Sequence, residues 1–369
     1  MKIGERFFTN YDEEIKGVIV NGKKITKGDL WGISEEDSEL GYAPKENAVS
    51  FNGWWQSNNV GARSRNNTSR HILSGMQRII IFGESFTNCS RIPQEETWPF
   101  FLNNKSNTVE FLNFGVDGYS MCQCLLRYEN LKSKIDYDIV MLVFVVSTDL
   151  WRDINTLRQL RGWENYPLIP RYCIENNQLK LIKSPYKSYE DLERENANNL
   201  SDTLKKHLRT YDRFYSKVQY ESPAFIGKLI SYKLLAERLH YFQKKSLLDN
   251  IMKTDSEAMI VSQKIFEEMN NKAKRDGKKF VLVFLPLKRD VEDYRNNSLF
   301  RKKYDKIVSY IEKEDMICID LMKDFLKVKL SQFDFDYYGI HYGLKTNKII
   351  SEILWENLEA LKLLTHKKE

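Results

Sequence analysis

The sequence lacks the features that mark several classes of protein. No run approaches the roughly 18 consecutive apolar residues of a membrane-spanning helix, and the amino terminus lacks the apolar segment of a secretory signal peptide. The five cysteines are scattered, odd in number and without metal-ligand spacing, which is typical of reduced thiols inside a cell. These absences predict a cytoplasmic protein with no transmembrane segment, no metal site and no organic cofactor.

The composition indicates a folded chain with one locally basic segment. Of 369 residues, 42% are hydrophobic and 13% aromatic, which excludes disorder and supports a substantial core. Residues 151–250 hold 18 Lys and Arg against 12 Asp and Glu, so they contain the whole net charge of +6. Basic and aromatic residues alternate over residues 205–245, which could suit nucleic acid or an anionic surface. A solvated helical face is the plainer interpretation, and we expect no specific nucleic-acid binding.

Five short apolar runs alternate with helical segments. The runs at residues 77–82, 108–114, 139–146, 279–285 and 316–320 are rich in β-branched and aromatic side chains, as buried strands are. Such alternation predicts an α/β fold with an open parallel sheet and helices on both faces.

The remaining segments predict three parts. Residues 1–75 read as a β-rich extension packed on the core, with an Asn-Gly hairpin signal inside residues 18–25. Residues 76–154 and 251–369 form the α/β domain, and residues 155–250 form a helical insertion between the third and fourth strands. Within the extension, residues 51–70 either reach the cleft at the sheet or, as their composition favours, cover an edge strand.

The insertion is expected to contain helices over residues 193–217 and 224–250. Apolar residues recur along the second helix at helical spacing, which predicts a face that belongs to the core. These residues are Phe225, Leu229, Tyr232, Leu235, Leu239 and Phe242.

Two residues are candidates for nucleophilic chemistry. Ser85 lies two residues past Gly83, where a strand of a parallel sheet delivers side chains to a cleft at the carboxyl edge. A Gly-x-Ser match alone is more often an ordinary turn or helix cap. His341 lies in a loop before a final helix over residues 345–363, and a lone histidine there is more often structural than catalytic.

Four segments taken in order resemble the SGNH (GDSL-type) hydrolase family. They are Gly-Glu-Ser at residues 83–85, Asn-x-Gly-x-x-Gly at residues 113–118, Ser-Thr-Asp at residues 147–149, and His341. The resemblance covers roughly residues 40–150 and 255–365. It implies a flavodoxin-like, three-layer α/β/α fold with a five-stranded parallel sheet.

The resemblance also implies roles for individual residues. Ser85 would be the nucleophile and His341 the general base, while the backbone N–H of Gly118 would face the oxyanion together with that of Ser85. Two positions depart from the family pattern, the first of them mildly. Glu84 replaces the aspartate beside the serine, and Thr148 stands where the family has an oxyanion asparagine.

The position of the catalytic acid departs most from the family pattern. The family places an aspartate three residues before the histidine, and this chain has Tyr338 there. Asp336 reaches the imidazole if the loop bends, for which Gly339 supplies backbone freedom. Asp334 is the weaker candidate, and without either acid the site would be a Ser-His dyad.

Two functions follow from the resemblance. The first is a serine-dependent esterase or O-acyltransferase that acts on a small acyl ester through an acyl-enzyme on Ser85. Family analogy suggests a carbohydrate as the alcohol, with the aromatics of residues 52–56 as a stacking surface. The alternative is a catalytically degenerate SGNH-fold protein that binds a ligand or partner. Ser85 and His341 favour the enzyme, whereas Thr148 and Tyr338 favour the binding module.

Overall fold

The computed structural model describes residues 33–50, 52–160, 168–186, 191, 195, 200–221, 227, 229–314, 316–336 and 339–365, and the backbone of residues 19–20 and 23–24. The chain divides into two compact units. One comprises residues 1–27, 36–42 and 150–262, and the other comprises residues 28–35, 43–149 and 263–369. The domain boundaries expected from the sequence remain a prediction.

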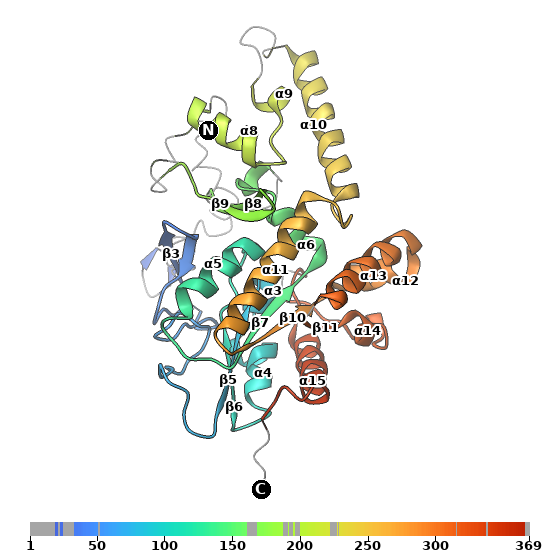
Figure 1. The fold of residues 1–369 in the computed structure, drawn as a ribbon. Coiled ribbons are helices and arrows are strands. Elements are labelled where there is room, and N and C mark those ends of the chain that lie inside the picture. The colour runs from blue at the N-terminus through green and yellow to red at the C-terminus, as the bar shows by residue number, and fades with distance from the viewer. Residues whose placement is uncertain are drawn as a thin grey trace. The chain divides into compact units, whose positions relative to one another are not determined.

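The second unit is built on a five-stranded parallel sheet (Figure 1). Its strands are β5 (Gln77–Phe82), β6 (Val109–Asn113), β7 (Ile139–Phe144), β10 (Lys279–Phe284) and β11 (Ile317–Asp320). They lie in the order β11-β10-β7-β5-β6, which is the flavodoxin-like order that the family resemblance implies. The order reverses between β5 and β7, and ligands of such sheets bind beyond the carboxyl ends of strands at this switch point.

Helices cover both faces of the sheet. On one face α15 (Leu344–Ala360) packs against α4 (Trp98–Asn103), and the ring of Trp355 contacts that of Phe111 on β6. The other face is covered by α5 (Met121–Leu131), α11 (Glu257–Arg275) and α13 (Ser298–Lys313). Aromatic pairs join each of these helices to the sheet: Phe82 with Tyr128, Phe144 with Phe266, and Phe284 with Tyr304.

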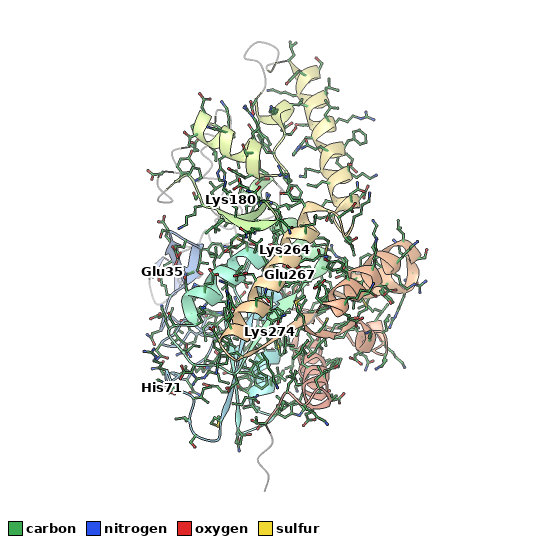
Figure 2. The ribbon with its side chains drawn as sticks, viewed as in Figure 1. Glu35, His71, Lys180, Lys264, Glu267 and Lys274 are labelled. Carbon is green, nitrogen blue, oxygen red and sulfur yellow. The ribbon has the colours of Figure 1, made fainter. Side chains whose placement is uncertain are left out.

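The outer side of α11 is polar. Lys264 and Glu267 project from this helix as a surface ion pair of 2.7 Å (Figure 2). The shorter elements of the chain are β3 (Ser34–Asp37), β4 (Gly41–Pro44), α3 (Ser85–Asn88), α6 (Val146–Arg152), α12 (Lys288–Asn296) and α14 (Met322–Phe325). No helix in the described ranges is both long and apolar enough to cross a bilayer.

The first unit contains hairpins as well as helices. β1 (Ile19–Val20) pairs antiparallel with β2 (Lys23–Lys24), where the Asn-Gly signal predicts a hairpin. β8 (Arg171–Glu175) pairs with β9 (Gln178–Ile182) across a turn in which Asn176 and Asn177 have positive φ. The sequence analysis missed this second hairpin, although asparagine tolerates positive φ better than most residues.

The helix expected over residues 193–217 is interrupted. α8 spans Asp202–Tyr211 and α9 spans Lys217–Tyr220, with Asp212 extended between them. The carboxylate of Asp212 is buried and accepts hydrogen bonds from the backbone N–H groups of Thr156 and Leu157, at 2.7 and 2.8 Å. A buried carboxylate held in this way stabilises the break in the helix.

The prediction of a core face on the long insertion helix is wrong. In α10 (Ile230–Asn250), whose 21 residues are all described, Ala236 alone is buried. Of the residues expected in the core, Leu229, Leu235, Leu239 and Phe242 are 46–55% exposed, and Phe225 lies outside the described residues. Tyr232 is half-buried and its hydroxyl donates to the carbonyl of Val218, so the predicted face is divided between an attached and an exposed part.

Two glycines keep the turn after β5 compact and close to the loop after β6. A Cβ at Gly83 would lie 2.2 Å from Oγ1 of Thr87 within the same turn, and a Cβ at Gly115, in the loop after β6, would lie 2.6 Å from the backbone nitrogen of Asn88. Both distances are too short for any side chain.

We expect Gly115→Ala to destabilise the fold by about 1–3 kcal/mol, because the added methyl would have to displace backbone. Thermal unfolding followed by circular dichroism measures the loss. Gly53→Ala is the control, since its Cβ would have open space and its positive φ of 70° would cost only backbone strain. If Gly115→Ala lost no more stability than Gly53→Ala, the close approach of the loop after β6 to Asn88 would be contradicted.

Candidate active site

The turn after β5 presents Ser85. β5 ends at Phe82, and the side chain of Glu84 then caps α3 by accepting a hydrogen bond of 2.9 Å from the backbone N–H of Phe86. Ser85 is the first residue of α3 and therefore lies at the carboxyl edge of the sheet, beside the switch point.

His341 contacts this serine, although 256 positions separate the two residues. Its Nε2 lies 2.8 Å from Oγ of Ser85. This distance allows direct proton transfer from the hydroxyl to the imidazole. The structure thus brings together the nucleophile and the base that the sequence predicts.

The loop around His341 holds the ring in place. Phe335 and Tyr342 form an antiparallel bridge, and the N–H of Asp336 donates to the carbonyl of His341 at 2.7 Å. The hydroxyl of Tyr342 donates to the carbonyl of Pro286 at 2.7 Å, which fastens the loop to the end of β10. The ring of His341 also packs against Phe86, with centroids 4.7 Å apart.

Asp336 lies on the far side of the imidazole. Its Oδ2 is 3.3 Å from Nδ1 of His341, and its side chain is fully buried. Burial alone would raise the pKa of Asp336, but hydrogen bonds from His341 and from the N–H of Ile340 outweigh burial and lower the pKa. The carboxylate therefore stays ionised throughout the pH range in which an ordinary imidazole titrates.

The other candidates for the acid are placed elsewhere or not described. Asp334 accepts hydrogen bonds from the backbone N–H groups of Lys345 and Thr346, at 2.9 and 2.7 Å, at the start of α15. Its carboxylate thus caps the start of α15, and the contacts described for it are with this helix and not with the imidazole. Tyr338 lies outside the described residues. Gly339 has a φ of +69°, which is the backbone conformation that the expected bend requires.

Glu84 also contacts Ser85. Its Oε2 lies 2.6 Å from Oγ of Ser85, while its Oε1 accepts from Phe86. The serine hydroxyl has a single hydrogen and two acceptors within reach, Glu84 and His341. A general base must receive that hydrogen, so the Glu84 carboxylate competes with His341 for it.

The two predicted oxyanion positions differ in their surroundings. Gly118 has a φ of +74° and lies in the loop after β6, whose Val116 N–H donates to the carbonyl of Gly83 at 3.1 Å. The hydroxyl of Thr148 donates to the carbonyl of Val145 at 3.2 Å, within the first turn of α6. Both oxyanion roles remain predictions.

The extension before β5 supports the nucleophile turn. The indole N–H of Trp55 donates to Oδ1 of Asn88 at 2.8 Å, and Nδ2 of Asn88 donates to Asp117 at 2.8 Å. The buried guanidinium of Arg63 donates to the carbonyls of Asn88, Trp54 and Ile92. Burial lowers the pKa of Arg63 to about 10, which leaves the side chain charged at neutral pH.

Residues 52–70 contact the edge strand, as their composition favours, because Arg63 pairs with Asn113 at the end of β6. One expectation for residues 52–56 is corrected. Trp55 is buried, so it is not available to stack on a carbohydrate, whereas Trp54 is 41% exposed. Sequence analysis missed the Asn88 contacts because both partners are distant in the chain.

The nearby thiol does not offer a second nucleophile. Cys89 is buried and its Sγ lies 3.2 Å from the carbonyl of Phe86. Burial raises the pKa of this thiol to about 12, which keeps it protonated and unreactive.

Comparisons with known proteins found similar solved structures only. No family model and no curated protein sequence matches the chain. Similar solved structures include a member of the lipolytic G-D-S-L family from Veillonella parvula, at 12% identity and TM-score 0.36, which covers 76% of this chain and 97% of that one. Another is the acetylxylan esterase Axe2 from Geobacillus stearothermophilus, at 12% identity and TM-score 0.37, with 78% and 96% covered.

A third similar structure is the esterase EstA from a Pseudoalteromonas species, at 12% identity and TM-score 0.36, with 78% and 100% covered. The first is described as belonging to the GDSL group that the four sequence segments resemble. Identity and TM-scores this low do not transfer a site or an activity, so the function is inferred from this chain's own residues.

The positions of the two aspartates predict different effects of the same substitution. Asp336→Asn should lower the rate of ester cleavage by about 10²–10⁴-fold, because the amide no longer stabilises an imidazolium. Asp334→Asn should cost about 1 kcal/mol of stability through the cap of α15 and leave the rate nearly unchanged. Steady-state kinetics with a chromogenic acetyl ester and thermal melts separate the two. Equal rate losses in the two variants would show that Asp336 does not act as the acid that orients His341.

Glu84→Gln should increase the reactivity of Ser85 severalfold, up to about tenfold, because the amide can donate to Oγ and leaves the hydroxyl hydrogen to His341. The Gln carbonyl can still cap α3. The rate constant for phosphonylation of Ser85 measures its reactivity. Glu84→Ala is the comparison variant, because it removes both the cap of α3 and the contact with Oγ of Ser85. A rate that falls in both variants would mean that the carboxylate assists the serine.

Proposed function

We propose that this chain is a serine-dependent esterase or O-acyltransferase of the SGNH type. One observation carries the proposal, the chain of contacts from Ser85 Oγ through the His341 ring to Asp336, at 2.8 and 3.3 Å. A nucleophile, a base and an orienting acid at these spacings suit acyl transfer. The sheet's switch point is also where such folds bind their ligands.

Each proton in the proposed reaction has a place. Oγ of Ser85 attacks the acyl carbonyl carbon while its proton moves to Nε2 of His341. The resulting imidazolium donates its Nδ1–H to Asp336 and returns the Nε2 proton to the departing alcohol. The acyl-enzyme is then attacked by water or by a second alcohol, which loses its proton to the same nitrogen. The bond between the acyl carbon and Oγ of Ser85 breaks, and Oγ takes that proton back from Nε2. The N–H groups of Ser85 and Gly118 are the proposed oxyanion donors.

We propose a small acyl group on an alcohol, with a carbohydrate as the candidate alcohol. The support for the carbohydrate is limited to the exposed Trp54 ring and to the resemblance. We also propose that the protein acts in the cytoplasm, since all five cysteines are free thiols.

The second candidate is a binding module with the same fold. The contact between Glu84 and Ser85 favours it, because a carboxylate that keeps the hydroxyl hydrogen would leave the serine unreactive. The hydrogen bond of Thr148 within its own helix also favours it.

If the chain is a serine esterase, a single serine, Ser85, should be labelled covalently. A fluorophosphonate should form an adduct on Ser85, and Ser85→Ala should abolish the adduct and lower turnover of an acetyl ester by at least about 10³-fold. Ser90→Ala is a matched control, because this buried hydroxyl in the same turn bonds to Asp117 instead of His341. Peptide mapping by mass spectrometry locates the adduct. A folded protein with neither adduct nor turnover would favour the binding module.

A further inference from the structure

The exposed side of α10 carries large apolar residues together with polar and charged ones. Six large apolar residues on this helix are 46–75% exposed: Ile230, Leu234, Leu235, Leu239, Tyr241 and Phe242. At 100° per residue they fall within one half of the helical wheel. A helix that packs on a core commonly has an apolar stripe of about that width, but turned inward. We call these six residues the outward face of α10.

The opposite side of the helix is the one attached to the protein. The hydroxyl of Tyr232 donates to the carbonyl of Val218, and the amide of Gln243 donates to the carbonyl of Tyr215, both at 3.2 Å. Ala236, the buried residue, lies on this side with them, and α9 lies beside it (Figure 1). The outward face is therefore not the surface that holds α10 in place.

Cations lie among the apolar residues. Arg238 and Lys245 fall within the same half of the wheel, and the guanidinium carbon of Arg238 lies 5.9 Å from the centroid of the Phe242 ring. Ser231, Ser246 and Asp249 also fall within this half, so it holds two cations and one acid. The wider segment of residues 151–250 contains the whole positive excess of the chain. Long basic side chains at such positions can reach outward past the apolar atoms around them.

We propose that the outward face of α10 binds the surface of an anionic lipid bilayer. An interfacial helix buries leucine and aromatic side chains at the boundary of the acyl chains and directs Lys and Arg to the headgroups. Anionic lipid attracts the same cations electrostatically. The charge of the segment complements such a surface and the apolar face supplies the inserted part.

Other occupants fit less well. A second copy of the chain would bring Arg238 and Lys245 against their own equivalents, which like-charge repulsion opposes. Nucleic acid would use the cations but leave six large apolar side chains without a suitable partner. The proposal is independent of the chemistry at Ser85.

Vesicle sedimentation with the full chain tests the proposal. The protein should pellet with vesicles of phosphatidylcholine and phosphatidylserine, at least severalfold more than with phosphatidylcholine alone, and high salt should weaken the binding. Leu234→Asp with Phe242→Asp should reduce the bound fraction about tenfold or more. Arg238→Glu with Lys245→Glu should remove the preference for phosphatidylserine. Leu299→Asp, at a residue of α13 that is 61% exposed, should have no effect.

A fluorescence measurement gives a second test. Leu235→Trp should show a blue-shifted emission with the mixed vesicles, and Leu299→Trp should not. The proposal is wrong if the folded protein fails to bind these vesicles or if the paired Asp variant binds as wild type. It is also wrong if Leu234→Asp instead dissociates a dimer, or if the charge reversal abolishes oligonucleotide binding and leaves vesicle binding intact.

Discussion

The close approach of two backbone turns is the constraint on which the candidate site depends. Gly115 leaves no room for a Cβ beside Asn88 and Thr87, so the turn carrying Ser85 lies directly against the loop after β6. Asn113 strengthens this contact, since its amide donates to the carbonyl of Thr87 at 2.8 Å. The position of the serine at the end of β5 is thus set by backbone geometry rather than by its own side chain. A side chain held in this way needs little reorganisation before it reacts.

The sheet and the Ser85–His341 pair could be predicted because their signals are local. Strands buried on both faces read as continuous apolar runs, and each site residue follows a strand or precedes a helix. The contact of Asp336 with the imidazole was inferred from the carboxylates available near His341, and its geometry follows from the bridge between Phe335 and Tyr342. Spacing along the chain could not reveal that bridge.

Other features depend on contacts between distant residues. Trp55 and Arg63 reach Asn88 from a segment whose composition alone suggested a cover for an edge strand. The surroundings of α10 were misjudged for a related reason. The spacing of Leu235, Leu239 and Phe242 shows that they share a face, but it does not show what that face contacts. Periodicity measures amphipathicity, and burial depends on the partner.

The buried guanidinium of Arg63 has a consequence for how much of the chain can be removed. Its hydrogen-bond acceptors are carbonyls of Trp54, Asn88 and Ile92, which come from both sides of β5. A guanidinium loses its hydration only when such acceptors replace water, so these loops and the arginine become ordered in one cooperative step. A shortened chain that begins at β5 would leave those carbonyls without their donor. We therefore expect that a fragment with an ordered serine turn must begin before Arg63, well upstream of the first strand of the sheet.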